Sequence, residues 1–586
     1  MNKQWDLTIL YNGFDTPEFA ADMAAFDKAI AETIAFGEKA QTLSPEELLL
    51  GYIKLETAIN SLAEKLFIYA NLRYSANTAD VEAQGTMGVL MGKLSATAAP
   101  SAAINKAIAK IENIEEIIGQ NEILKEHSYR ILTIVKNSKH LLSDAEESLF
   151  AEMNISGANA WSDLQSALTS SLKVDYKGEQ ITLSSVRNLA YDPDAEVRKS
   201  AFEAELAAYP KIETATAFAL NSIKLQVINE ASRRGYASPL AKALDNSAMK
   251  QETLDALLTA MNEYMPAFRR YLKAKAKALG HEGGLPWYDL FAPMGKSDKK
   301  YTTEEARDYL LSIFAKFDTE LHDMVKEAFD NSWIDFFPRE GKVGGAFDCA
   351  VHSAGQSRVL TNFDGSFSDI VTLAHELGHS FHDRQVYKNS PLNREYSMPV
   401  AETASTFNET LVMNTAIAEC TDRDTKLALI ESQLMDATQV IVDIYSRYLF
   451  EASVFENRPA EFLSAERCCE LMLEAQKAAY GDGLDENTLH PYMWLCKGHY
   501  YSGGLSFYNY PYAFGALFAR GLYAKYLEEG PAFVETYKKM LRATGTSTVE
   551  DAALVSGIDL TDVNFWRSGL ESMKGQIDEF CALVEK

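Results

Sequence analysis

The chain has little cysteine, no long apolar run and no segment that resembles a linker. Its six cysteines are spread over 586 residues without a C-x-x-C pair, so we expect reduced thiols and not a disulfide framework. No run of 18 apolar residues occurs, which argues against a membrane-spanning helix. The length alone would allow about four domains, but no Pro/Gly/Ser-rich stretch divides the chain into that many.

Basic residues are scarce relative to acidic ones. Lysine and arginine total 56 against 83 aspartates and glutamates, which gives a net charge of −27. Such a field repels nucleic acid and anionic membrane surfaces. Residues 1–6 contain no apolar segment of the kind found in a signal peptide. We therefore expect a cytoplasmic protein that binds neither nucleic acid nor membranes.

Helix-start signals recur along the chain and predict a mainly α fold. Ser44-Pro45 places a cap before a proline, and Ser143 with Glu146 has the spacing of a capping box. Long helical runs are predicted at residues 19–37, 47–72, 425–455 and 461–480. One exception is residues 172–183, whose alternating pattern around Lys177-Gly178 predicts a small hairpin.

The residues that suggest chemistry gather between positions 364 and 409. Ser366 and Asp369 have capping-box spacing, so a helix should begin there. His375 and His379 are four residues apart and share one face of that helix. Two neutral imidazoles in this arrangement can bind one tetrahedral zinc at about 2.0–2.1 Å each. Glu376 lies beside them and can reach a metal-bound water without binding the metal.

A catalytic zinc needs a third protein ligand and one open position. Ser397 is a plausible N-cap of a second helix, which would carry Glu402 near its start and Glu409 about two turns later. We take Glu402 as the third ligand. Ser405, Thr406 and Glu409 are candidates to hold the histidine N–H groups. Ligand type indicates zinc, although manganese or cobalt could occupy such a site.

Two further segments have distinctive composition. Residues 343–347 and 358–363 look like two strands that lead into the histidine helix. The paired glycines in the first indicate either a bulge or a close approach of another backbone, such as a peptide added to the strand edge. Residues 490–515 are rich in glycine and tyrosine and include His499. They could supply hydrogen-bond donors to a developing oxyanion, but packing is the simpler explanation for most of these tyrosines.

Taken together, these residues resemble the oligoendopeptidase F and thimet oligopeptidase family of zinc peptidases. The resemblance covers most of the chain and is most specific from Thr372 to His382. It also includes residues 5–7, 285–290, 344–347, 361–363, 499 and 507–512. The connection from His379 to Glu402 looks shorter than in the thimet branch, which favours the oligoendopeptidase F branch.

The resemblance implies a fold and a site. The fold would be a two-lobed helical clamshell around a deep substrate channel, with a small β-sheet next to the zinc-binding helix. We divide the chain into an N-terminal helical lobe, residues 1–200, and a catalytic domain, residues 201–586. One Zn²⁺ would bind His375, His379 and Glu402, with Glu376 as general base. His499 and Tyr510 are implied as transition-state and substrate-binding groups; further candidates for substrate contact are Gly344, Gly345, Ala346, Tyr501 and Tyr508.

The sequence therefore predicts a zinc-dependent endopeptidase that hydrolyses short, unstructured peptides. One alternative is a zinc carboxypeptidase or dipeptidyl carboxypeptidase. An alternative of a different class is a catalytically inactive helical protein that binds peptides. The cleavage preference, the physiological substrate and the oligomeric state do not follow from the sequence.

Overall fold

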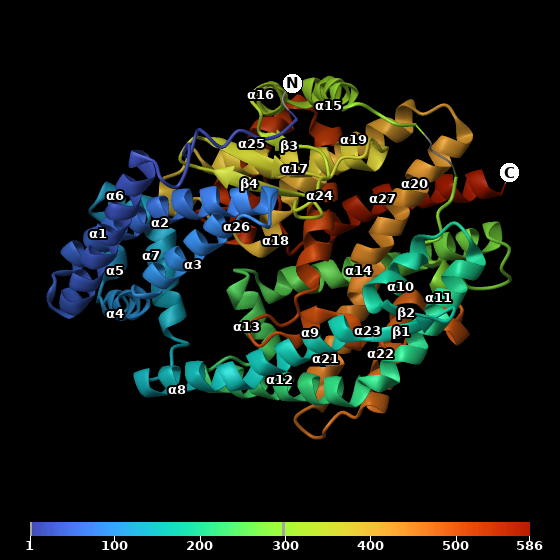
Figure 1. Cartoon of the computed structure of the whole chain (residues 1–586), viewed down its shortest axis with the longest axis horizontal. Coiled ribbons are helices and arrows are strands. Elements are labelled where there is room, and N and C mark those ends of the chain that lie inside the picture. Colours follow the sequence, from blue (N-terminus) through green and yellow to red (C-terminus); the bar gives the residue numbers. More distant parts are fainter. Residues whose placement is uncertain (1–2, 296–298, 586) are drawn as a thin grey trace. The chain divides into compact units, whose positions relative to one another are not determined.

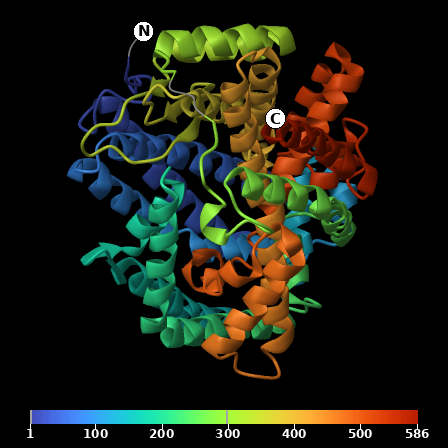
Figure 2. The ribbon, with the colours of Figure 1, turned by 90° about the vertical axis from the view of Figure 1, so that its right-hand side faces the viewer.

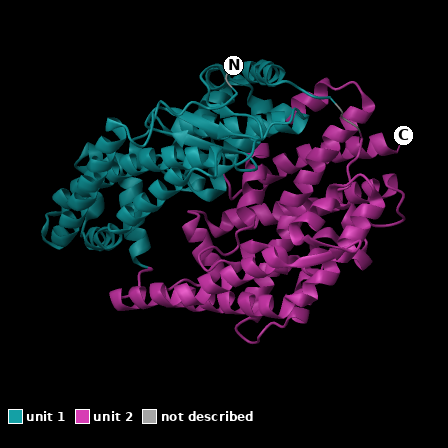
Figure 3. Ribbon diagram, viewed as in Figure 1, with its two compact units in different colours: residues 1–139, 298–412, 525–558 teal, residues 140–297, 413–524, 559–586 magenta. Residues whose placement is uncertain are grey.

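The structure is a computed structural model that describes residues 3–295 and 299–585, and it is mainly helical as predicted (Figure 1). The chain forms two compact units, each assembled from three separate segments (Figure 3). Unit 1 comprises residues 1–139, 298–412 and 525–558. Unit 2 comprises residues 140–297, 413–524 and 559–586.

These units differ from the division at residue 200 that the sequence suggested. Residues 140–297 run through that position within unit 2. The reason is packing between segments on either side of it: helix α9 (Ala160–Ser171) packs on α12 (Glu213–Arg233), and strand β1 (Lys173–Tyr176) packs on α11 (Ala195–Ala208).

Unit 1 begins with N-terminal helices, and its remaining elements come from the middle and the end of the chain. The first group is α1 (Pro17–Lys39), α2 (Pro45–Ala76), α3 (Val81–Ser95), α4 (Ala98–Ile108), α5 (Ile114–Gly119), α6 (Glu122–Glu126) and α7 (Ser128–Ser138). The second group is α15 (Thr303–Phe317), α16 (Thr319–Asp330), β3 (Ile334–Asp335), β4 (Phe347–Val351), β5 (Gln356–Leu360), α17 (Phe367–Val386), α18 (Met398–Ala401), α25 (Pro531–Ala543) and α26 (Val549–Leu554). Within this second group, α15 packs against α16, and both are light green in Figures 1 and 2.

A small sheet lies next to α17, where the sequence placed one. Its strand order is β3-β5-β4, with β4 antiparallel to β5 and β3 parallel to β5. Both β4 and β5 pack on α17. Val351 and Leu360 of this sheet are fully buried in a core that also takes in Trp5, Tyr11 and Tyr69 from the N-terminal part of the chain. The sheet and α17 are thus held by residues far apart in sequence.

The strand limits differ from those predicted. The first strand begins at Phe347 and not at residue 343, because Gly345 has a left-handed φ of +78° that interrupts extended structure. The second strand ends at Leu360 and not at residue 363. The predicted hairpin at residues 172–183 is confirmed: β1 pairs antiparallel with β2 (Glu179–Thr182), and Lys177 and Gly178 form the turn with positive φ.

Unit 2 is helical apart from this hairpin. Its other elements are α8 (Asp144–Asn154), α10 (Leu183–Asn188), α13 (Pro239–Asn246), α14 (Gln251–Ala278), α20 (Arg423–Thr438), α21 (Ile444–Asn457), α22 (Ala465–Tyr480), α23 (Met493–Cys496) and α27 (Val563–Val584). The predicted helix 425–455 is present as α20 and α21 joined by a π-helical turn at Gln439–Asp443, and α22 begins at Ala465 after the cap of Ser464. Two helices, α19 (Thr403–Glu419) and α24 (Tyr510–Glu529), contain the unit boundaries.

Two further observations concern apolar helices and cysteines. None of the helices within residues 3–295 and 299–585 is long and apolar enough to cross a membrane. All six cysteines are free thiols.

Candidate metal centre

Helix α17 begins as its sequence predicts. The Ser366 hydroxyl accepts a hydrogen bond from the Asp369 amide at 3.2 Å, and the Asp369 carboxylate accepts one from the Ser366 amide at 3.0 Å. This capping box satisfies amide groups that the first turn would otherwise leave without partners. Ile370, Leu373 and Leu377 are fully buried on the apolar face. The register of the helix is therefore fixed, and with it the positions of His375 and His379.

Three donor atoms converge beside this helix. The Nε2 atoms of His375 and His379 lie 3.2 Å apart. One Glu402 carboxylate oxygen lies 3.3 Å from the His375 Nε2 atom and 3.5 Å from that of His379. Tetrahedral ligands at about 2.0–2.1 Å from a zinc ion are separated from one another by about 3.3 Å. The triangle of donor atoms therefore has the dimensions of three corners of a zinc tetrahedron, and the residues present fit the metal.

Glu402 occupies a break between two helices, whereas the sequence suggested one continuous helix. Helix α18 ends at Ala401, and α19 begins at Thr403. The Glu402 carbonyl accepts the Thr406 amide at 3.1 Å, so Glu402 caps the second helix. The Ser405 hydroxyl lies 3.0 Å from the Glu402 carboxylate and donates to it. This local turn orients the carboxylate toward the two histidines.

The two histidine rings also have hydrogen-bond partners outside the triangle of donor atoms. A Glu409 carboxylate oxygen lies 2.9 Å from the His375 Nδ1 atom, and the backbone of Ala401 hydrogen-bonds to His379. Such partners fix the ring orientation and the tautomer of a metal-binding histidine. Among the candidates from the sequence, Glu409 thus holds a histidine, whereas Ser405 holds the carboxylate of Glu402.

The charges in this cluster do not balance without a cation. Burial opposes protonation of His375, but the Glu402 and Glu409 carboxylates raise its pKa to about 10. Burial and the neighbouring His375 lower the pKa of His379 to about 4. Burial acts against ionisation of Glu402, yet both histidines lower its pKa to about 2. A proton on His375 is the only positive charge that the three residues themselves supply, and a divalent ion would replace it.

Glu376 is buried beside the donor atoms, with 6% of its surface exposed. Burial raises its pKa to about 7, against the opposing charge of His375. The backbone amide of Asp348 in β4 hydrogen-bonds to its carboxylate. A carboxylate with a pKa near neutrality suits general base and acid chemistry. The Asp348 contact could not be predicted from the sequence, because any residue type except proline supplies a backbone amide donor.

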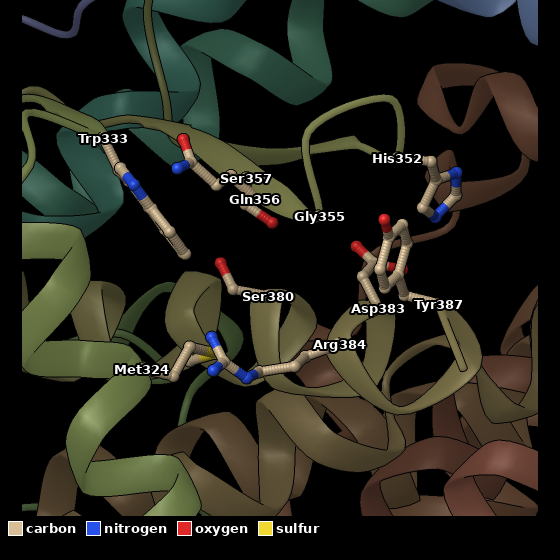
Figure 4. A pocket seen from close by; sticks show the side chains of 10 residues that line it. All are labelled: Met324, Trp333, His352, Gly355, Gln356, Ser357, Ser380, Asp383, Arg384 and Tyr387. Carbon is tan, nitrogen blue, oxygen red and sulfur yellow. The ribbon is translucent and has the colours of Figure 1, made fainter. Parts of the chain in front are cut away.

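Two half-buried aspartates, Asp348 of β4 and Asp383 of α17, interact with each other, and Figure 4 shows Asp383. The Ser380 hydroxyl donates to Asp348 at 2.6 Å, and the Tyr396 hydroxyl donates to Asp383 at 3.1 Å. Burial and the adjacent Asp383 raise the pKa of Asp348 well above its usual value. Ser380 and Asp383 line a cavity of about 10 Å³ next to β5, which has room for one water molecule. These contacts connect α17 to β4, the strand whose Asp348 amide hydrogen-bonds to Glu376.

The glycine segment before β4 is exposed. Gly344 and Gly345 form a bend, and no atom lies within 4 Å of a Cβ built at either position. The Asn362 amide group donates to the Gly345 carbonyl at 2.8 Å. Strand β4 itself is an edge strand of its sheet, since β5 is its one neighbour among the described strands. No neighbouring atom of the described residues fills the space beside Gly344 and Gly345, and contact of Gly344, Gly345 and Ala346 with a substrate stays a prediction.

The remaining predicted residues belong to unit 2. His499 is half-buried, and its ring contacts those of Tyr508 and Tyr512 at 5.5 and 5.9 Å between centroids. Tyr510 is 1% exposed and its hydroxyl donates to the Ser247 hydroxyl at 3.0 Å, so its contact with a substrate stays a prediction. Tyr501 is 1% exposed, and its hydroxyl donates to the Trp494 carbonyl at 3.1 Å. The geometry of Tyr501 therefore fits packing better than substrate contact.

Two family profiles and several known proteins match this chain. The sequence profile described as Peptidase family M3 matches residues 188–571, and the one described as Oligopeptidase F matches residues 109–173. Oligopeptidase PepF of Bacillus subtilis is 28% identical over 89% of this chain and 79% of its own length. An oligoendopeptidase F homolog of Lactococcus lactis is 26% identical over 99% of this chain and 97% of its own.

Solved structures share the fold. A crystal structure of oligoendopeptidase-F from Enterococcus faecium superimposes with a TM-score of 0.71 at 19% identity and covers 97% of this chain and 99% of that one. A Chlamydophila abortus protein superimposes with a TM-score of 0.87 at 22% identity and covers 99% and 98%. Because the family profile matches well over half of the chain, this protein belongs to peptidase family M3, a metallopeptidase family, and within it to the oligoendopeptidase F branch.

Proposed function

We propose that this protein is a zinc-dependent endopeptidase that cleaves short, unstructured peptides. The observation that carries the proposal is the triangle formed by the Nε2 atoms of His375 and His379 and a Glu402 oxygen, with sides of 3.2, 3.3 and 3.5 Å. Two imidazoles and one carboxylate form the ligand set of many catalytic zinc sites. A bound zinc ion polarises a scissile carbonyl and makes water acidic enough to attack it near neutral pH.

Glu376 is proposed as the general base. It would accept a proton from the attacking water and then pass that proton to the leaving amine. In the metal-free chain, burial raises the Glu376 pKa to about 7 against the opposing charge of His375, a range that suits a group that takes up and releases a proton. The Asp348 amide would hold the carboxylate in place during both transfers.

His499 and Tyr510 are proposed as donors to the oxyanion that forms when the carbonyl is attacked. The His499 Nδ1 atom is buried and has no hydrogen-bond partner among the described residues. Burial and the positive charges of Arg447 and Lys497 lower the pKa of His499, so the ring is neutral at physiological pH. Donors aimed at an oxyanion are worth about 3–4 kcal/mol each. Tyr508 remains a candidate for substrate contact.

Strand β4 is proposed as the docking edge for the substrate backbone. Its outer edge is free of other described strands, and the exposed Gly344 and Gly345 and the half-buried Ala346 lead into it. An extended peptide can add to such an edge through backbone hydrogen bonds, with little dependence on side chains. The deep channel implied by the family resemblance would limit substrates to short peptides. A cytoplasmic location stays a prediction.

The first test is mass spectrometry of a peptide mixture digested with and without a chelator, with C-terminally amidated peptides included. We expect internal cuts in amidated peptides, loss of cleavage with the chelator, and recovery when zinc is added back. Trimming from free C-termini alone would replace this proposal with the carboxypeptidase or dipeptidyl carboxypeptidase alternative. No cleavage by zinc-loaded protein would favour the inactive peptide-binding protein.

A further inference from the structure

Unit 2 contains a cavity that the proposed chemistry does not use. Its volume is about 300 Å³, and it is lined by residues of α10, α11 and the segments around positions 288 and 490. Ligand pockets of this size hold small molecules. Three cations, Arg187, Arg198 and Lys497, line it together with one carboxylate, Glu205. This is an unusual concentration of positive charge in a chain of net charge −27.

Two of these cations keep unused hydrogen-bonding capacity. Arg198 is 3% exposed and is neutralised within the chain, since it pairs with the buried Asp289 at 2.8 Å and donates to two backbone carbonyls. Arg187 is 31% exposed and donates only from its Nη1 atom, with Glu205 among the acceptors at 2.6 Å. Within residues 3–295 and 299–585, neither the Nε nor the Nη2 atom of Arg187 has a hydrogen-bond partner. One edge of its guanidinium group is therefore available.

Lys497 is the second available cation. Its ammonium group makes no hydrogen bond or ion pair with any residue that the structure describes. Burial lowers its pKa, and the positive charges of Arg447 and Arg187 lower it further, while Asp443 opposes them. Two neighbouring cations that repel each other across a half-buried cavity would both be stabilised by an anion. The planar fork of Arg187 favours a carboxylate or another flat oxyanion.

The rest of the wall is aromatic. The Tyr191 and Phe291 rings lie 4.8 Å apart, and those of Phe202 and Tyr288 lie 5.9 Å apart. All four line the cavity, as does Trp287. Such rings pack well against another planar group. A cavity of about 300 Å³ accommodates one aromatic ring with a short acidic arm and excludes much larger molecules.

We propose that this cavity binds a small aromatic carboxylate, with the carboxylate between Arg187 and Lys497 and the ring against the aromatic wall. No residue of the metal centre takes part, so the site is independent of the proposed hydrolysis. Glu205 plays a supporting part: it holds Arg187, and His490 lies 3.0 Å from the same carboxylate.

The test is titration calorimetry of the full chain after treatment with a chelator, so that a metal cannot take the carboxylate. The probes are 3-phenylpropionate, its neutral amide and inorganic phosphate. We expect the carboxylate to bind about tenfold or more tightly than the amide, because charge-assisted hydrogen bonds are lost in the amide. Equal affinity for acid and amide, or no binding of the acid, would overturn the proposal. Phosphate binding as tight as that of the acid would overturn the aromatic part.

Variants locate the binding site. Lys497→Gln should weaken 3-phenylpropionate about tenfold or more. Lys199→Gln, which removes the same charge from an exposed position of α11, should leave the affinity unchanged. Unchanged affinity in Lys497→Gln, with an unfolding midpoint equal to that of the parent, would place any binding elsewhere. If Lys497→Gln does not fold, the comparison of acid with amide in the parent chain still decides the proposal.

Discussion

Among the described residues, the carboxylates of the candidate metal centre lack the lysine and arginine partners that buried carboxylates have elsewhere. Such partners occur in both units, and in unit 1 the buried Asp335 pairs with Arg339 at 2.6 Å and Lys342 at 2.7 Å. In unit 2, Glu451 pairs with Lys224 at 2.6 Å, and both side chains are completely buried. The buried Asp289 likewise pairs with Arg198. In unit 1, Glu376, Glu402 and Glu409 surround two histidines, and within the described part of the chain no lysine or arginine forms an ion pair with any of the three.

This difference separates carboxylates that are paired within the chain from carboxylates that are proposed to bind or assist a metal. A buried carboxylate is costly unless a cation or hydrogen-bond donors compensate for it. In unit 2, Lys224 and Arg198 supply the compensating positive charge for Glu451 and Asp289. The cluster around His375 and His379 supplies imidazoles, which are neutral when they bind a metal. The cluster therefore lacks a compensating positive charge, which a divalent ion could supply.

The largest effect is expected for the proposed base. Glu376→Gln should reduce kcat by about 10²–10⁴-fold, because the amide cannot accept the proton of water. Metal content should stay at one ion per chain, since Glu376 is proposed not to be a ligand. Steady-state cleavage of a fluorogenic peptide and elemental analysis would measure the two quantities. Near-normal turnover in this variant would remove Glu376 from its role.

A carboxylate of unit 2 should instead affect stability. Glu451→Ala leaves Lys224 buried without its ion-pair partner and also removes the acceptor for Asn509 at 3.0 Å. Breaking a buried pair in this way costs about 3–5 kcal/mol of unfolding free energy. Denaturant unfolding would measure it, and metal affinity should not change. Replacing both partners, Lys224→Met with Glu451→Leu, should recover much of the loss; no recovery would argue against the ion pair as the cause.

The matching change in unit 1 is Glu402→Ala. We expect zinc affinity to fall by about 100-fold or more, because even residues that only orient the ligands contribute 10–100-fold. The unfolding free energy of the metal-free protein should change much less than in Glu451→Ala, since Glu402 is about one-third exposed. Competition with a chromophoric chelator would give the affinity. Unchanged metal retention would exclude Glu402 as the third ligand.

The sequence predicted most of this site because its signals are local. Helix start, histidine spacing and the apolar face of α17 follow from residue type within a few positions. The family resemblance then extended the prediction to the oligoendopeptidase F branch, which the comparisons confirm. The hairpin at residues 172–183 was also predictable from alternation and turn residues.

Long-range contacts were not predictable in the same way. The Asp348 amide that holds Glu376 belongs to another strand, and nothing in the residue type at position 348 indicates a backbone contact. The break at Glu402 depends on capping by its own carbonyl and on Ser405, within a segment whose composition suits a helix. The two units combine segments hundreds of residues apart, so a single boundary at residue 200 could not describe them.

The smallest expected effect concerns protons. In the metal-free chain, Glu402 and Glu409 raise the His375 pKa to about 10, so His375 carries a proton at pH 8. Zinc requires the neutral ring, and its binding at pH 8 should therefore release about one proton from His375, in addition to the proton lost by water that the metal acidifies. Glu376, with a pKa of about 7, is mostly ionised at this pH and should add little. Release should decline as the pH rises through 10, because the ring then loses its proton before zinc binds.

Calorimetric titration of zinc in buffers of different ionisation enthalpy would count these protons. Glu409→Gln provides the comparison, because it removes the carboxylate that lies 2.9 Å from the His375 Nδ1 atom. Without that negative charge the His375 pKa should fall, so the number of protons released at pH 8 should fall with it. Equal release in the parent and in Glu409→Gln would mean that Glu409 does not set the charge of His375. The contrast between the carboxylates of the metal centre and the paired carboxylates Glu451 and Asp289 would then not extend to the charge of His375.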